Sequence, residues 1–214
     1  MAGSLLIVAA PSGAGKTSLV RHLLQARPQV RLSVSFTTRR PRPGERDGVD
    51  YFFVDHPRFE ALREAGQLLE WAVVHGNLYG TSREWIEAQM KAGNDIVLEI
   101  DWQGAAQVMA DFAMAIGIYI LPPSMAALRE RLIGRGQDAV EVIERRLAAA
   151  RTELEQAHRF QYVIINQDFN AAAAELVAIA DVARLRFDRQ LAAEPALFND
   201  LGIVGVAANP ASPA

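Results

Sequence analysis

The chain has 214 residues, of which 50% are hydrophobic and 22% are charged, as in an ordinary globular protein. This length suits one full core with insertions better than two independent domains. The formal net charge of -3 predicts no general surface for polyanions, so we expect no nucleic acid partner. The lack of cysteine excludes disulfides and thiolate metal sites and fits a reducing, cytoplasmic compartment. We also expect no membrane span, because the longest apolar stretch near the start, residues 5–10, is too short for a bilayer.

The first predicted element is a strand over residues 5–9, a short apolar run without alternation that is typical of a strand buried on both faces. A glycine-containing loop follows it. Leu19, Val20 and Leu23 are then spaced for one face of a helix. A strand, a glycine loop and a helix in this order predict the start of a parallel α/β sheet.

The loop between these elements, residues 10–17, matches the phosphate-binding pattern G-x-x-x-x-G-K-[ST] except that Ala10 stands at the first glycine. Its glycines allow backbone N–H groups to approach phosphate oxygens, and the positive end of the next helix points at the same place. Lys16 would contact the outer phosphates, and the hydroxyl of Thr17 would bind Mg²⁺. The alternative is a glycine-rich turn with an incidental lysine, but the flanking strand and helix favour phosphate binding.

Further buried strands are predicted at residues 96–100, 116–121 and 162–165, and helical spacing between them indicates a doubly wound core. Asp101 follows the first of these strands, where a carboxylate suits Mg²⁺ directly or through water. Glu99 leaves the same face of that strand. The alternative is a pair of acids without a role, but burying two acids in an apolar run is costly unless they have partners.

Two segments interrupt this core pattern. Residues 33–80 contain a basic, proline-rich turn and aromatic segments, which predict a small β-rich insertion with one short helix near residues 58–65. Residues 124–151 are dense in Arg and Glu around the sequence Gly-Arg-Gly at 134–136, and they predict two helices that form a mobile lid. After Asp168 we expect an alanine-rich helix to about Leu191 and then a flexible tail.

Six segments, taken in order, resemble the guanylate kinase family. They are the phosphate loop, SVSFTTRRPRPGE at 33–45, YFF at 51–53, NLYG at 77–80, DWQG at 101–104 and GRG at 134–136. The resemblance covers about residues 4–190, and an ordered set of motifs is far more specific than the phosphate loop alone. It implies an α/β fold with a P-loop kinase core and a parallel sheet, a small β-rich monophosphate-binding insertion and a helical lid.

The resemblance also implies boundaries and a reaction. The core would comprise residues 1–34, 83–123 and 152–192, the GMP-binding insertion 35–82 and the lid 124–151, with the flexible tail at 193–214. The enzyme would transfer a phosphoryl group from ATP, with Mg²⁺, to GMP. Oligomerisation as a homo-oligomer stays open.

Site residues follow from the matching positions. The catalytic residues would be Lys16, Arg39, Arg135 and Arg146. ATP would be bound by Ser12, Gly13, Ala14, Gly15, Lys16, Thr17, Arg131, Arg135 and Asn166. GMP would be bound by Ser35, Arg39, Arg42, Tyr51, Glu70, Tyr79, Thr81 and Asp101. The metal would be held by Thr17 and Asp101.

Elementary chemistry supports the arginine assignments but leaves alternatives. Arg39 and Arg42 lie in one proline-stiffened turn, and planar guanidinium groups suit a monophosphate. Taken alone, the same turn reads equally well as a solvated basic surface. Lid arginines could instead form ion pairs on the helix surface with Glu130 and Glu144.

The sequence departs from the family pattern at four positions and leaves three alternative functions to consider. Ala10, Leu78, Thr81 and Gln167 replace residues that are frequent in the family, and the methyl group of Thr81 puts a base contact there in question. A hydrolase would leave the segment from Arg39 to residue 51 unexplained. A catalytically silent binding module commonly has a degraded phosphate loop, which is intact here. A related kinase with another phosphorylated acceptor is the third alternative.

Overall fold

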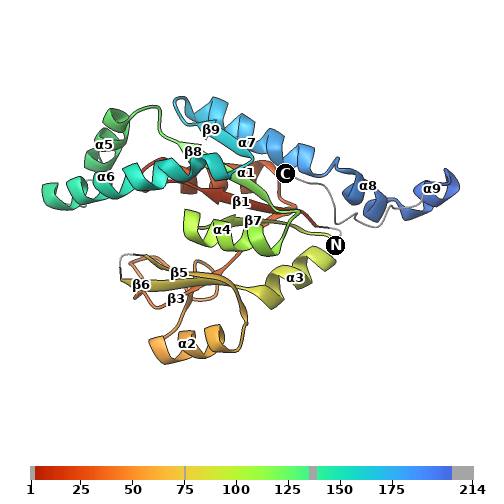
Figure 1. The fold of residues 1–214 in the computed structure, drawn as a ribbon, viewed down its shortest axis with the longest axis horizontal. Helices are drawn as coiled ribbons and strands as arrows, with labels where there is room; N and C mark the ends of the chain where they lie inside the picture. Colours follow the sequence, from red (N-terminus) through yellow and green to blue (C-terminus); the bar gives the residue numbers. More distant parts are fainter. Residues whose placement is uncertain (1–2, 75, 135–138, 204–214) are drawn as a thin grey trace.

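The computed structural model describes residues 3–74, 76–134 and 139–203. Its core is a sheet of five parallel strands in the order β2-β7-β1-β8-β9 (Figure 1). The predicted α/β class with a parallel sheet is therefore confirmed. The strands are β1 (Leu5–Ala9), β2 (Val30–Leu32), β7 (Asp95–Glu99), β8 (Ile116–Leu121) and β9 (Tyr162–Ile165).

Helices cover both faces of this sheet, which explains why its central strands are continuous apolar runs. Side chains alternate between the two faces of a strand, so a strand covered on both sides needs apolar residues throughout. Val8 and Ile118 face the side with α1 and α7, whereas Ile7 and Leu98 face the side with α3 and α4. The helices are α1 (Lys16–Ala26), α3 (Arg83–Lys91), α4 (Trp102–Asp111) and α7 (Phe169–Ala183).

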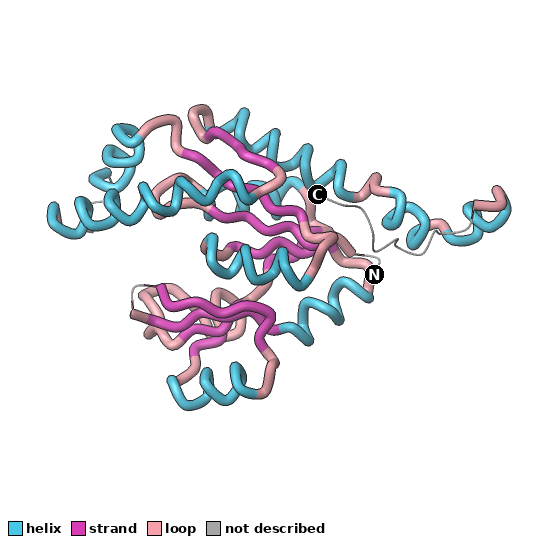
Figure 2. Tube along the Cα trace, in the orientation of Figure 1, coloured by secondary structure: helices cyan, strands magenta, loops and turns pink. Residues whose placement is uncertain are grey.

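A second, four-stranded sheet has the order β4-β3-β6-β5 and lies apart from the core sheet (Figure 2). Strands β3 and β4 are parallel, and the other pairs are antiparallel. Phe59 on α2 is fully buried against Leu68 and Leu78 and gives this sheet a small core of its own. Helix α4 lies between the two sheets (Figure 1). The elements are β3 (Ser35–Thr37), β4 (Phe52–Phe53), α2 (His56–Glu64), β5 (Leu68–Val74) and β6 (Asn77–Ser82).

Residues 124–151 form the two predicted helices, α5 (Met125–Gly134) and most of α6 (Val140–Leu154). They pack on each other through a separate apolar cluster that includes Leu128, Leu132 and Leu147. A short 3-10 helix, η1 (Glu155–Arg159), leads from α6 to the edge strand β9.

The C-terminal part differs from the expected single helix. Helix α7 ends at Ala183, and a turn in which the N–H of Leu185 donates to the carbonyl of Val182 separates it from the next helix. Two short helices follow, α8 (Phe187–Ala193) and α9 (Pro195–Asp200). The expected flexible tail at 193–214 thus includes a helical segment, and residues 204–214 lie outside the described part of the chain. Proline at the start of α9 suits a first helical turn, but the sequence offers no Gly or Pro signal for the break after α7.

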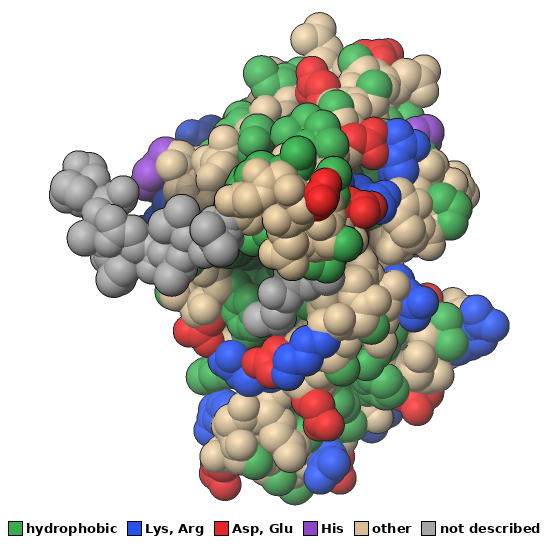
Figure 3. All heavy atoms as spheres, turned by 90° about the vertical axis from the view of Figure 1, so that its right-hand side faces the viewer, with side chains coloured by type: hydrophobic (Ala, Val, Ile, Leu, Met, Phe, Trp, Pro, Cys, Tyr) green, Lys and Arg blue, Asp and Glu red, His purple; other side chains and the backbone are tan. Residues whose placement is uncertain are grey.

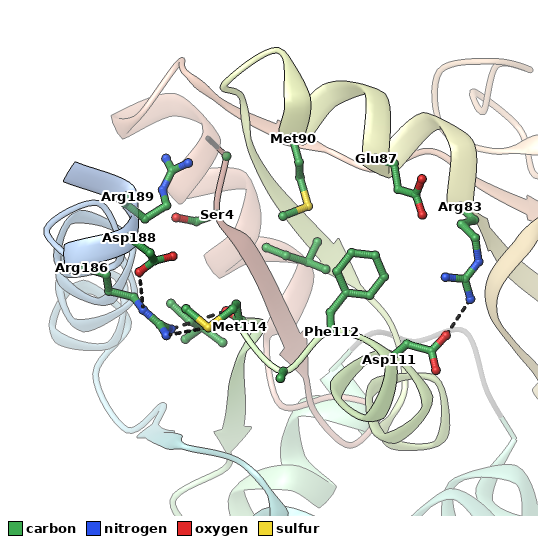
Figure 4. A pocket seen from close by; sticks show the side chains of 14 residues that line it. Ser4, Arg83, Glu87, Met90, Asp111, Phe112, Met114, Arg186, Asp188 and Arg189 are labelled. Atoms are coloured by element: carbon green, nitrogen blue, oxygen red, sulfur yellow. Dashed lines mark hydrogen bonds and ion pairs between the residues drawn. The ribbon is translucent and has the colours of Figure 1, made fainter. Parts of the chain in front are cut away.

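A cavity of about 440 Å³ lies at the edge of the sheet where β1 and β8 begin. Met90, Phe112 and Met114 contribute apolar walls, and Arg189 lies nearby on α8 (Figure 4). No residue that the sequence assigns to a site lines this cavity. On the face shown in Figure 3, cationic and anionic side chains are interspersed, in keeping with the small net charge. Within the described ranges, no helix combines the length and apolarity needed to cross a membrane.

The central sheet gives a direct test of the packing. Ile118 on β8 is fully buried, whereas Val163 on the edge strand β9 is 45% exposed. We expect Ile118→Ala to lower the free energy of unfolding by about 2–5 kcal/mol, because it leaves a cavity in a close-packed core. The control Val163→Ala should lower it by less than about 1 kcal/mol, since surface substitutions cost little. Urea denaturation measures both values, and equal losses would contradict the layer arrangement.

Candidate active site

The phosphate loop turns between β1 and α1 through two left-handed glycines, Gly13 (φ 96°) and Gly15 (φ 99°). A Cβ at Gly15 would lie 2.4 Å from Nδ2 of Asn166, so this position excludes any side chain. Nδ2 of buried Asn166 donates to the carbonyl of Ala14 over 2.7 Å. Asn166, directly after β9, therefore fixes the loop in addition to the loop's own turns. Ala10 lies before the two positions that require glycine.

Lys16 and Thr17 begin α1 and meet the end of β7. Nζ of Lys16 donates to the carbonyl of Ile100 over 2.7 Å, and the hydroxyl of Thr17 donates to the carboxylate of Glu99. Burial lowers the pKa of Lys16, and the carboxylates of Glu99 and Asp101 act in the opposite direction. Lys16, the single charged residue among residues 10–17, is thus surrounded by carboxyl groups.

Asp101 has a structural contact of its own. It is the N-cap of α4, and its Oδ1 accepts a hydrogen bond from the backbone N–H of Gly104 over 2.9 Å. The structure thus pairs Thr17 with Glu99, while Asp101 caps the neighbouring helix. The described residues contain no cluster of three or more acidic or histidine side chains suited to a metal. The hydroxyl and carboxylate oxygens present nevertheless fit Mg²⁺, which usually takes one or two carboxylates together with substrate phosphates.

Two of the three predicted lid arginines, Arg131 and Arg146, lie in the described part of the chain, and both reach the phosphate loop. Nη2 of Arg146 donates to Oγ of Ser12 over 2.5 Å. Nη1 of Arg131 donates to the carbonyl of Ala14 over 3.3 Å, and its Nη2 donates to the carbonyl of Asn166 over 2.7 Å. Glu144, which we had considered as their surface partner, pairs instead with Arg129. The third predicted arginine, Arg135, lies outside the described residues.

Glu153 is a site residue that sequence reasoning missed. It lies two helical turns after Arg146, so both point from the same face of α6 toward the loop. Burial and nearby Asp101 raise the pKa of its carboxyl, whereas Lys16 and the N–H of Ser12 favour its ionised form. The spacing of seven residues on α6 is the sequence signal that could have found it.

The basic turn after β3 gathers an aromatic and cationic cluster. Nη2 of Arg39 lies 2.8 Å from Oε1 of Glu45, and its guanidinium group stacks 5.3 Å from the ring centre of Tyr51. The rings of Tyr51 and Tyr79 are 5.9 Å apart. The hydrogen bond to Glu45 raises the pKa of Arg39, and Arg39 lowers the pKa of Glu45. Three of the predicted residues therefore meet, and Glu45 is a partner that the motif reading did not include.

Arg42 and Glu45 define the far side of the same turn. The backbone N–H of Arg42 donates to Oε2 of Glu45 over 2.7 Å, and Arg42 itself is exposed. Glu45 thus holds the turn at two points, and the side chain of Arg42 extends into solvent.

Glu70 lies on β5 of the second sheet and is only 3% exposed, so it is not a solvated acid at a strand edge. Oγ1 of Thr81 donates to Oε1 of Glu70 over 2.6 Å, and Oγ of Ser35 lies 3.4 Å from Oγ1 of Thr81. Burial raises the pKa of Glu70 to about 7. The structure therefore brings these three predicted residues together around one buried carboxyl group.

The raised pKa of Glu70 predicts a pH-dependent stability without nucleotides. The folded state keeps the proton up to about pH 7, whereas the unfolded chain loses it near 4.5. The free energy of unfolding should thus fall as the pH rises through this window, by on the order of 3 kcal/mol. Glu70→Gln should lack this component, and Glu64→Gln, a change of an exposed acid on α2, should keep it. Denaturant titrations from pH 4 to 8 test this, and parallel curves for wild type and Glu70→Gln would refute it.

Comparisons with known proteins agree with this geometry. The guanylate kinase family model matches residues 2–182. Guanylate kinases of Aromatoleum aromaticum and Bordetella pertussis are each 56% identical, over 89% of this chain and 93% of theirs for the first, and over 94% of both chains for the second. The crystal structure of guanylate kinase from Anaplasma phagocytophilum superposes with a TM-score of 0.77 at 32% identity, covering 95% of this chain and 97% of that one. The chain therefore belongs to the guanylate kinase family.

Proposed function

We propose that this protein transfers the γ-phosphoryl group of ATP to GMP and gives ADP and GDP. The observation that carries the proposal is that the start of helix α4 connects the phosphate loop with Glu70. Lys16 of the loop donates to the carbonyl of Ile100, directly before the N-cap Asp101, and Gly104 in the first turn of α4 lies against the carboxyl of Glu70. A donor site and an acceptor-base site are thus neighbours, as direct transfer between two nucleotides requires.

ATP binds at the phosphate loop in this proposal. Backbone N–H groups at residues 12–17 and the positive end of α1 surround its phosphates, and Lys16 adds a charge. Asn166 lies beside the adenine. Residues 124–151 close as a lid, and Arg131 and Arg146 then turn from their contacts at the unliganded loop to the phosphates, where Arg135 joins them. Closure also excludes water, so that the γ-phosphoryl group is not lost to hydrolysis.

Mg²⁺ is expected to enter with ATP, and Thr17 and Asp101 are its proposed ligands. Bound there, the ion would neutralise charge on the phosphate oxygens. Glu99, which accepts the hydrogen bond of Thr17, orients that hydroxyl in the unliganded protein.

GMP binds against the second sheet in this proposal. Arg39, Arg42, Tyr51 and Tyr79 hold its phosphate, and the cluster around Arg39 is already ordered by Glu45. A phosphate oxygen of GMP attacks the γ-phosphorus in line, a new P–O bond forms, and the bond to the ADP oxygen breaks. GMP is itself the nucleophile, so no covalent enzyme intermediate is needed. Arg39 also places positive charge beside the attacking phosphate.

Guanine is read by Glu70 with Ser35, Thr81 and Asp101. Guanine presents N1–H and the N2 amino group side by side, and one carboxylate can accept from both. Adenine lacks the amino group and places a lone pair at N1, which would face the carboxylate. Thr81 occupies one oxygen of Glu70 from the protein side, so its hydroxyl serves as a support for the base-reading acid.

The proposal predicts a strong preference for GMP over AMP. A coupled assay of ADP release should give a kcat/KM for GMP that exceeds that for AMP by about 10⁴-fold, because buried polar partners would stay unpaired with adenine. Glu70→Gln should lower kcat/KM for GMP by about one to two decades and leave the KM for ATP unchanged. The exposed control Glu64→Gln should match wild type. Equal rates with AMP and GMP, or a silent Glu70→Gln, would mean that another acceptor must be sought.

A further inference from the structure

Helix α4 joins the two halves of the proposed site. It begins directly after β7 of the core sheet, and it packs along β5, the strand that carries Glu70 (Figure 1). Gly104 in its first turn and Gln107 three residues later lie on one face of the helix. Both contact β5 at or next to Glu70, so this face is where the core sheet can determine the position of the base-reading acid.

Gly104 allows an approach that no other residue would permit. A Cβ at this position would lie 2.4 Å from Oε2 of Glu70, closer than real Cβ atoms come, and 3.1 Å from its Cδ, so the carboxyl would have to move. Gly104 is not among the residues with positive φ, so backbone conformation does not demand glycine there. Glycine inside a helix costs roughly 1 kcal/mol relative to alanine. The close packing of Glu70 is therefore the physical reason for a glycine in this turn.

Both oxygens of Glu70 have defined surroundings as a result. Oε1 accepts from Thr81, and Oε2 lies against the bare backbone of Gly104. The N–H of Gly104 donates to Asp101, so the same turn also orients the second acid assigned to the base. The positive end of the helix macrodipole favours negative charge at both places.

Gln107 fixes the backbone of β5 to this helix. Its Nε2 donates to the carbonyl of Trp71 over 2.8 Å, and its Oε1 accepts from the N–H of Trp71 over 3.2 Å. The side-chain amide thus pairs with Trp71 as a neighbouring strand would. Trp71 directly follows Glu70, so the pairing prevents β5 from sliding along α4.

We propose that Gly104 and Gln107 are positioning residues that make the acceptor site selective for guanine by holding Glu70 against helix α4. The inference rests on the proposed function, in which Glu70 reads the base. In this inference, selectivity for guanine over adenine depends on the packing of α4 against β5 as well as on the groups that touch the base.

The central test replaces Gly104 with alanine in the full chain. Gly104→Ala should lower kcat/KM for GMP by about one to two decades, the range for losing charge-assisted hydrogen bonds, with the KM for ATP unchanged. The melting temperature should change little, because the higher helix propensity of alanine offsets part of the cost of displacing the Glu70 carboxylate. The double variant Gly104→Ala/Glu70→Asp should recover part of the GMP-over-AMP preference, since the shorter carboxylate withdraws from the new methyl group.

Substitution of Gln107 is a second, independent test of the positioning role. Gln107→Ala should raise the KM for GMP about three- to tenfold, in line with modest hydrogen bonds at an exposed position, and leave ATP kinetics intact. The control is Gln89→Ala on α3, whose amide bonds to Asn94 away from this contact. It should behave as wild type with both nucleotides.

The outcomes separate this inference from the proposed function. If wild type does not phosphorylate GMP, the proposed function fails. If wild type is active but Gly104→Ala has normal GMP kinetics, only the positioning role is overturned. Equal losses for ATP and GMP with a lower melting temperature, or no recovery in the double variant, would also overturn it. If Gly104→Ala does not fold, the KM for GMP of Gln107→Ala is compared with that of Gln89→Ala. Equal values would overturn the positioning role.

Discussion

The site depends on the balance of charge around Lys16. This buried ammonium group bonds to the carbonyl of Ile100. It lies near four carboxyl groups, those of Glu99, Asp101, Glu153 and Glu70. Burial raises the pKa values of Glu70 and Glu153, nearby Asp101 raises them further, and Lys16 acts in the opposite direction. An incoming triphosphate with its metal and lid arginines would redistribute the charge. The unliganded site is thus poised for anionic ligands accompanied by cations.

The geometry of this centre comes from four separate pieces of the chain. The glycines of the loop allow its tight turns, and Asn166 from β9 holds the loop from the other side. Helix α6 brings Arg146 to the loop, so movement of the lid helices can act directly on the phosphate site. Helix α4 supports the base-reading side through Gly104. The loop, Asn166 and the start of α4 follow the carboxyl ends of β1, β9 and β7, the edge of the sheet where ligands of such folds usually bind.

Local spacing explains what could be predicted from sequence. The strand, glycine loop and helix around Lys16 are encoded within a few residues, and the charged helix pair at 124–151 is visible from its composition. The roles of Ser35, Glu70 and Thr81 came only through the family resemblance, because their proximity depends on the pairing of β3, β5 and β6.

Contacts between distant elements explain what could not be predicted. Glu45 bonds to Arg39 through the shape of one turn, and Glu153 reaches the loop only because α6 packs across it. The role of Gly104 depends on a strand more than thirty residues earlier, and a glycine in a helical segment gives no hint of its neighbour. The break between α7 and α8 had no local signal either, since neither Gly nor Pro stands at residues 184–186.

The most direct test of the account is the turnover of Lys16→Ala with ATP and GMP. The side chain faces the phosphate site, so the variant should fold and should still bind GMP in calorimetry. Its kcat should fall at least ~10²-fold, because a lost charge contact to the transferring phosphate is worth about 3 kcal/mol or more. A folded Lys16→Ala protein with near-normal kcat would contradict the assignment of the phosphate loop and the charge balance on which the site rests.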